Sequence, residues 1–217
     1  MRTWHAVAAV IVLLIGCTVV SAEPTLNGYT GLLVIPTADT LGQGQYTVGV
    51  NSGELQDWDD WGYYATFGLG EQTEAGLLMF RTDGRTGDNT FLHIKRNLSE
   101  ITDGGPNIAA GIYDLTDEIE TTVYMVASWA QGNIVGEVEG RSVRFLDLHA
   151  GFAAGQLQDF FAGVDLRVGT EFTFMAEWVN DDVNIGARFS PVDNLTIDAG
   201  LLDVDDLAVN VSYTSNL

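Results

Sequence analysis

An alternation with a period of two runs through the C-terminal half of this chain and limits what it can fold into. In the segment 172–178, Phe172, Phe174, Ala176 and Trp178 alternate with Thr173, Met175 and Glu177. The same pattern recurs in three further segments and in a shorter one before them: 183–189, 195–201, 207–213 and 164–168. One apolar face and one small or polar face are typical of β-strands.

The connections between these segments are short and contain turn-forming residues. They are 169–170, 180–182 and 191–194, rich in Gly, Asn, Asp and Pro. Connections of this length join only antiparallel neighbours. The C-terminal half is therefore predicted to be an up-and-down meander.

The N-terminal half is less regular but is compatible with more strands. Its predicted strands are 29–36, 45–52, 62–69, 73–81, 89–97, 107–114, 121–130 and 143–153. Polar or glycine-rich connections separate them, among them 53–60, 82–88, 99–106 and 131–140. A meander of this size must close or expose its edges. The predicted fold is all-β, an antiparallel up-and-down (meander) β-barrel of about 12 strands.

The first residues predict export. Arg2 precedes an apolar run over 6–15, and Val20-Ser21-Ala22 offers small residues for cleavage. This is typical of a signal peptide, so we expect a leader over 1–22 and a barrel domain over 23–217. A retained anchor over 6–22 would lie at the short limit for a spanning helix. Leu14 to Cys17 also resembles a lipobox, so cleavage after Ala22 and lipidation at Cys17 both stay open, with cleavage after Ala22 preferred.

The charge balance excludes some partners. The chain has 9 Lys and Arg against 30 Asp and Glu, and removing residues 1–22 takes away Arg2 and no acid, which leaves 8 against 30, a formal charge of −22. So acidic a surface argues against nucleic acid and against docking onto anionic lipid headgroups. It suits water-facing loops.

Alternation alone does not say which face of the barrel is wet. A soluble barrel places its apolar face inward, whereas a transmembrane barrel places it outward around a polar lumen. Strands of about nine residues match the thickness of the outer-membrane apolar band. Aromatic residues gather at strand ends, and the other face is rich in Gly, Thr, Asn and opposite charges. These features favour an outer-membrane barrel with lipid as its partner.

The register of the alternation assigns residues to the two faces. The lumen is predicted to be lined by the charged residues Asp165, Arg167, Glu177, Arg188 and Asp198. Lipid is predicted to meet the aromatic residues Phe172, Phe174, Trp178, Phe189 and Tyr213. Whether the lumen is open depends on how its side chains pack.

No catalytic residue, metal site or cofactor is predicted. Asp147 and His149 would point the same way on a strand, but a hydrolase would also need a nucleophile, and Ser128 and Ser142 are merely available. Motifs of known hydrolases, metalloproteases and nucleotide-binding loops do not occur. The acidic clusters at 57–60 and 203–206 are interpreted as solvated turns rather than Ca²⁺ sites.

One stretch resembles a known family. Asn27 to Thr40 holds a G-L-x-x-x-P-[ST]-A segment formed by Gly31, Leu32, Pro36, Thr37 and Ala38. It is similar to the opening motif of YjbH-like outer-membrane proteins, which are associated with exopolysaccharide production and export. The segments 176–178 and 184–189 are similar to repeated strands of such barrels. Those proteins are several times longer and have a basic residue where Asp39 stands here, so the resemblance implies a short, single-barrel version.

Three functions stay open on this reading. The resemblance implies an outer-membrane barrel with a structural or transport role in surface polysaccharide export, with export components as partners. The alternatives are a soluble periplasmic barrel that binds an apolar ligand and a membrane-barrel lipid hydrolase centred on His149. The sequence leaves the substrate and the oligomeric state undetermined.

Overall fold

The computed structural model describes residues 22–52, 61–80, 89–99, 105–129, 134–138, 141–144, 147–157 and 159–217. Within 134–138 and 141–144 it describes the backbone alone. The predicted leader before Ala22, the acidic cluster at 57–60 and the side chain of Ser142 lie outside the described part. No helix in these ranges is long and apolar enough to cross a membrane.

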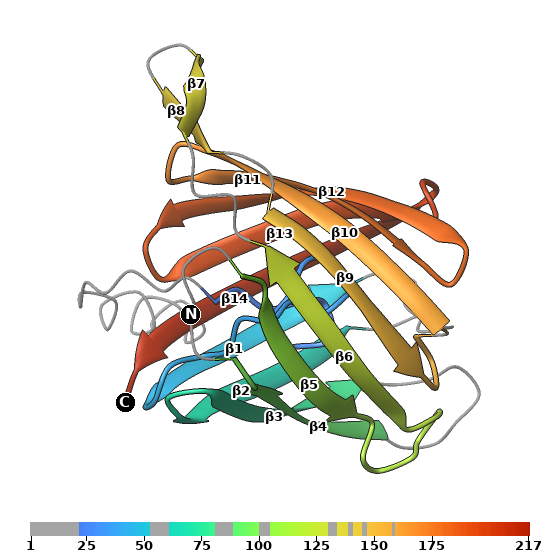
Figure 1. The fold of residues 1–217 in the computed structure, drawn as a ribbon. Coiled ribbons are helices and arrows are strands. Elements are labelled where there is room, and N and C mark those ends of the chain that lie inside the picture. Colours follow the sequence, from blue (N-terminus) through green and yellow to red (C-terminus); the bar gives the residue numbers. More distant parts are fainter. Residues whose placement is uncertain are drawn as a thin grey trace, which may run out of the picture.

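Twelve strands form a closed antiparallel barrel, which confirms the predicted fold class (Figure 1). Each strand pairs with its neighbours along the barrel, and the last closes on the first, from Gln45 opposite Asn216 to Ser52 opposite Val209. The strands are β1 (Gln45–Ser52), β2 (Gly62–Gly70), β3 (Thr73–Phe80), β4 (Asn89–Asn97), β5 (Asn107–Tyr113), β6 (Thr122–Trp129), β9 (Asp147–Ala154), β10 (Asp159–Val168), β11 (Phe172–Val179), β12 (Asp182–Val192), β13 (Leu195–Leu202) and β14 (Asp206–Asn216).

A small hairpin interrupts the meander between β6 and β9. It consists of β7 (Ile134–Val138) and β8 (Arg141–Arg144), and it touches the barrel where Val143 pairs with Val168 of β10. The sequence predicted 131–140 as a connection and one strand over 143–153. Both predictions were wrong in detail, because the hairpin takes residues from each and β9 begins only at Asp147. β6 pairs directly with β9 across this excursion.

The predicted strand over 29–36 was wrong, because that segment is not part of the wall. Residues 22–44, called the plug from here on, run inside the barrel (the blue segment before β1 in Figure 1). The plug folds back on itself through two isolated bridges, Pro24 with Thr30 and Gly31 with Pro36. Its apolar side chains are buried on every side, so its sequence looks like that of a buried strand.

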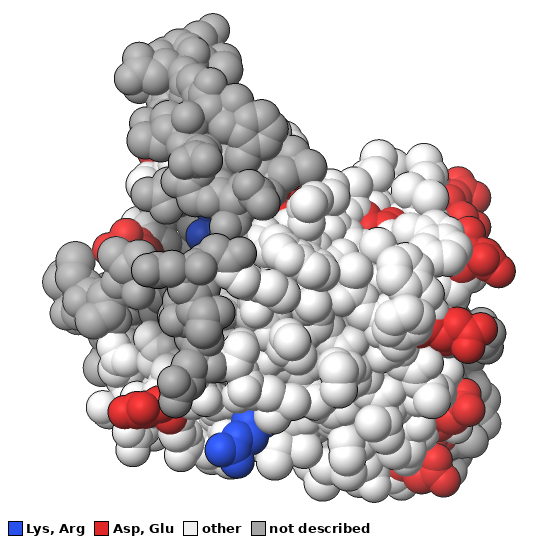
Figure 2. All heavy atoms as spheres, viewed as in Figure 1, with Lys and Arg blue, Asp and Glu red and all other residues white. Residues whose placement is uncertain are grey.

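The wall has an apolar outer face and a buried, largely polar inner face. In β4, Leu92 and Ile94 are each 40% exposed, whereas His93 and Lys95 between and after them are buried. The same inversion follows the other strands, whose exposed outward residues include Phe67, Met79, Met125, Phe152, Phe174, Ile185 and Leu207. Figure 2 shows the uncharged surface lying between two charged ends, with carboxylates gathered at the right-hand end. Transmembrane barrels have this arrangement.

Three inward-facing aromatic rings lie across glycines of the neighbouring strand. A Cβ added at Gly111 would come within 2.4 Å of the Tyr124 ring, its partner in the β5–β6 register. The other two cross-strand pairs are Gly49 with Tyr64 and Gly151 with Phe161. The rings therefore lie against the wall, and the centre of the lumen is left for the plug.

This packing predicts a cost for any side chain at Gly111. Replacing Gly111 by Val should displace the Tyr124 ring into the plug and destabilise the barrel by about 1–3 kcal/mol. The temperature at which the folded band on an SDS gel converts to the unfolded one measures the effect. Gly70→Ala is the matched control, since nothing lies within 4 Å of a Cβ there. Equal transition temperatures for the two variants would contradict this packing.

Candidate functional site

The plugged lumen is the candidate functional site. The main chain of the plug is irregular, and polar main-chain groups that are buried away from water need hydrogen-bond partners. Some bonds are internal to the plug: Thr25 N–H donates to the carbonyl of Tyr29 at 2.7 Å, and Leu26 N–H to that of Leu33 at 2.8 Å. Most of the others come from side chains of the wall.

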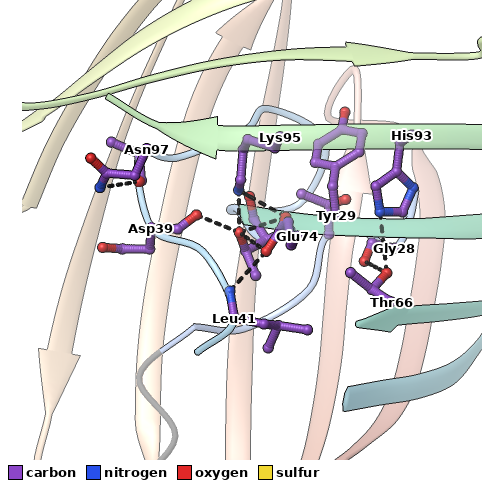
Figure 3. Close-up of polar contacts among 12 residues, drawn as sticks. Gly28, Tyr29, Asp39, Leu41, Thr66, Glu74, His93, Lys95 and Asn97 are labelled. Atoms are coloured by element: carbon purple, nitrogen blue, oxygen red, sulfur yellow. Dashed lines mark hydrogen bonds and ion pairs between the residues drawn. The ribbon is translucent and has the colours of Figure 1, made fainter. Parts of the chain in front are cut away.

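A buried ion pair clamps the plug at two points (Figure 3). Glu74 of β3 and Lys95 of β4 are cross-strand partners, their charged atoms are 3.1 Å apart, and both side chains are fully buried. The Glu74 carboxylate accepts the N–H groups of Thr30 and Leu41, each at 2.9 Å. Lys95 donates to the Thr30 carbonyl at 2.7 Å and also contacts the Thr30 hydroxyl. The two charges thus compensate each other and hold the plug together.

Arg188 makes a second clamp. It lies opposite Asp198 in the β12–β13 register, and its Nε donates to that carboxylate at 2.7 Å. Its terminal nitrogen Nη1 pairs with Glu23 of the plug at 2.9 Å. The guanidinium also donates to three plug carbonyls, those of Pro24, Gly31 and Leu32. The fixed fork of donors in Arg suits this convergence of acceptors.

Glu177 of β11 holds the turn of the plug. Its carboxylate accepts the N–H groups of Val34 at 2.9 Å and of Ile35 at 3.2 Å, and the side-chain amide of Asn184 at 2.9 Å. The Tyr29 hydroxyl donates to the Val34 carbonyl at 2.7 Å. Burial raises the pKa of the Tyr29 hydroxyl well above its usual range, so it remains a neutral donor.

Ser128, His149 and Asp165 form a hydrogen-bonded row across β6, β9 and β10. Ser128 Oγ lies 2.8 Å from His149 Nδ1, and His149 Nε2 lies 3.0 Å from Asp165. The sequence had paired His149 with Asp147, which lines the same small polar pocket of about 20 Å³. Ser128 Oγ also accepts the Ala38 N–H at 2.8 Å, and the residue is 7% exposed. Because the plug covers the hydroxyl and occupies one of its lone pairs, the row acts as another holding point for the plug.

The structure places the predicted residues on the two sides of the wall. Four of the five predicted lumen residues are 2–4% exposed and face the plug: Asp165, Glu177, Arg188 and Asp198. Arg167 is different, because its side chain is 39% exposed and lies 3.7 Å from Asp165. The five predicted lipid-facing residues are on the outer face, where Phe172 stacks on Phe189 at 4.8 Å, Trp178 is 38% exposed, Phe174 is 51% exposed and Tyr213 is half-buried.

Sequence reasoning missed Glu74, Lys95 and the holding role of Ser128. Part of the signal was present for the ion pair, because each charge stands at an inward position of a predicted strand, and Lys95 follows the alternating run from Phe91 to Ile94. The residues of the YjbH-like motif lie in the plug, ahead of β1 in the chain. Gly31 is needed there because a Cβ would come within 2.2 Å of the Ile35 carbonyl oxygen, and Thr37 and Ala38 follow the bridge that Gly31 forms with Pro36.

Metal ligands do not cluster in the described residues, where no group of three or more His, Cys, Asp or Glu could hold an ion. Asp203, Asp205 and Asp206 lie at the turn between β13 and β14.

Comparison with solved structures finds similar barrels. KdgM porin is similar with a TM-score of 0.52 and 6% identity, over 80% of this chain and 99% of KdgM. The low-pH structure of Pseudomonas putida OprB has a TM-score of 0.32 and 16% sequence identity, over 80% of this chain and 62% of OprB. Ail, the attachment invasion locus protein of Yersinia pestis, has a TM-score of 0.17 and 11% sequence identity, over 80% of this chain and 99% of Ail. At these identities the KdgM likeness shows the fold alone. No family model and no curated protein matches the chain.

The Glu74–Lys95 clamp predicts that substitutions at the adjacent residues Lys95 and Arg96 differ strongly in their effect on stability. Lys95→Met should leave the buried Glu74 carboxylate without its counter-charge and destabilise the folded barrel by about 3 kcal/mol. Arg96→Met removes the next positive charge along the same strand, but from an exposed position, and should leave stability unchanged. Urea unfolding in lipid vesicles, followed by tryptophan fluorescence, compares the two. Similar midpoints would refute the clamp.

Proposed function

We propose that this protein is an exported outer-membrane barrel with a transport or structural role, closed in the described state by its own N-terminal segment. The observation that carries the proposal is the inverted polarity of the wall. Large apolar side chains are exposed around the outside, and charged side chains are buried inside. In water such a barrel would expose far more apolar surface than soluble proteins tolerate.

The ends of the barrel support the membrane setting. The turns at one end carry carboxylates and, among their described residues, no Lys or Arg; they include Asp117, Glu118, Glu120, Asp181, Asp182, Asp203, Asp205 and Asp206. Charges at the ends and an apolar band between them fit a bilayer with water on both sides. The predicted signal peptide over 1–22 would deliver the chain to that membrane.

A transport role is favoured by what lines the wall behind the plug. Once the plug is gone, the inner face would present charged and hydrogen-bonding groups to water, including Asn51, Thr66, Glu74, Lys95, Asn184 and Asn210. That is the lining of a channel rather than of an apolar ligand site. Export of a surface polysaccharide, with export components as partners, is the finer proposal that the YjbH-like motif implies, and it requires the plug to leave the lumen.

The two alternative functions are less well supported. A soluble barrel binding an apolar ligand needs an apolar interior cavity, but here the plug fills the interior and the apolar face is outside. A lipid hydrolase needs a nucleophile that substrate can reach. Ser128 is covered by the plug and faces Nδ1 of His149, on the inner rather than the lipid-facing side.

Charged substitutions on the outer face test the membrane setting. Phe174→Arg and Ile185→Arg should each cost about 2–4 kcal/mol of insertion free energy and reduce recovery from the outer-membrane fraction. Val204→Arg, at an exposed turn residue, is the matched control and should insert normally. Folded Phe174→Arg protein in the soluble periplasm, in wild-type amounts, would sink the proposal.

Conductance in planar bilayers tests the closed state. The full-length barrel should conduct little, whereas deletion of residues 24–41 should produce stable open channels, because it empties a lumen lined by polar groups. The deletion variant must first show a folded, heat-modifiable band. Gly186→Leu is a second variant that keeps the chain length: a Cβ at Gly186 would come within 2.8 Å of Leu33 of the plug and should raise the open fraction. Unchanged conductance in both folded variants would argue for a purely structural barrel.

A further inference from the structure

The hydrogen bonds between plug and wall are made mainly to the main chain of the plug. Six N–H groups of the plug donate to wall side chains, those of Thr30, Val34, Ile35, Ala38, Leu41 and Gly42. Seven plug carbonyls accept from wall side chains, those of Pro24, Leu26, Gly28, Thr30, Gly31, Leu32 and Ala38.

The wall groups that make these contacts surround the plug. They are nine side chains on seven strands: Gln45, Asn51, Thr66, Glu74, Lys95, Asn97, Ser128, Glu177 and Arg188. Plug side chains contribute to this hydrogen bonding at Glu23 and Thr30. A wall that meets one segment from so many directions, mainly through groups common to every residue, has the properties of a peptide-binding surface.

Apolar side chains of the plug then define which segment fits. Leu33 approaches the wall backbone at two cross-strand glycines, Gly186 and Gly200, where a Cβ would come within 2.8 Å of its methyl group. Ile35 and Leu32 do the same at Gly163, at 2.6 and 2.7 Å. These glycines leave recesses for branched apolar residues.

We propose that the lumen is a binding site for a polypeptide segment that folds back on itself, recognised through its main chain, with the plug as its resident ligand. The ligand class is a peptide with a Leu-Leu-x-Ile centre. Its main-chain N–H and carbonyl groups form the hydrogen bonds with the wall that the plug forms. This deepens the proposed function, because it makes closure of the barrel a reversible binding event. It does not depend on conductance or on membrane insertion.

The plug is connected to the wall through a single accessible link. Gln43 is exposed, between Gly42 and Gly44, and β1 begins two residues later at Gln45. A protease recognition sequence inserted between Gln43 and Gly44 would allow the folded, full-length protein to be cut there. The severed plug would then be held by non-covalent contacts alone.

The experiment measures exchange of the severed plug in detergent. Cut protein is incubated with a fluorescent synthetic peptide of residues 23–42, and bound label is read by anisotropy after gel filtration. We expect the labelled peptide to replace the plug, and unlabelled peptide to compete for the site. Absence of label from the barrel would overturn the proposal, whether the severed plug remains permanently or leaves without replacement.

Two peptides altered at one residue test main-chain recognition. N-methylation at Val34 removes the N–H that Glu177 accepts, and should weaken competition roughly tenfold or more, as expected for a lost hydrogen bond to a charged group. Val34→Ala keeps this N–H and trims a half-buried side chain, so it should compete far better than the methylated peptide. Equal competition by the two would overturn recognition through the main chain.

A substitution in the wall, combined with N-methylation of the peptide, gives a double-mutant cycle. In full-length protein carrying Glu177→Gln, the penalty for N-methylation should shrink severalfold, because a weaker acceptor now faces Val34. An unchanged penalty would show that methylation acts by steric clash and would overturn the assignment of Glu177. Heat-modifiable mobility reports separately on barrel folding, and vesicle flotation on membrane insertion, so failure of the proposed function remains distinguishable from failure of this inference.

Discussion

The structure depends on satisfying an irregular main chain inside a closed barrel. Every peptide group of the plug carries an acceptor and, except at Pro24 and Pro36, a donor, and leaving these groups unpaired away from water would cost several kcal/mol. The wall meets this demand with charged side chains, since a carboxylate such as Glu74 or Glu177 can accept two N–H groups at once. Inward charges that resemble a channel lining are therefore also the partners of a peptide. Pairing Glu74 with Lys95, and Arg188 with Asp198, keeps those charges compensated.

The same need to accommodate the plug explains which inward positions of the wall are glycines. Charged side chains can reach the plug only if other inward positions leave room for it, and glycine provides that room. Gly186 and Gly200 leave recesses for Leu33, and Gly111 lets the Tyr124 ring lie against the wall. The outer face does not have to make room for a segment, and its positions are occupied mainly by large apolar residues. One strand thus carries two independent sets of constraints on its alternate positions.

Much of the wall could be predicted because of this separation. Alternation places every second residue on one face, so the strands at 45–52 and 89–97 were predicted with the bounds that the structure shows. The plug could not be predicted, since burial on all sides removes any period and leaves an apolar run that looks like a strand. Nor could the partners of the lumen charges, because Glu177 lies 143 positions from Val34 in the chain and Glu74 lies 44 from Thr30. The hairpin β7–β8 was missed because its glycine-rich sequence resembles a loop.

Recognition through the main chain also determines how stable closure can be. If apolar contacts alone held the plug, its removal would expose apolar wall to water at full cost. Here many of the groups that hold it, among them Lys95, Glu177 and Arg188, are ones that water solvates well, beside apolar contacts such as that of Leu33. Hydration of these charges in an open lumen would offset much of what the clamps contribute when the lumen is closed. The free-energy difference between the two states is therefore smaller than the number of buried contacts suggests, which is the condition for a segment that can both close a barrel and leave it.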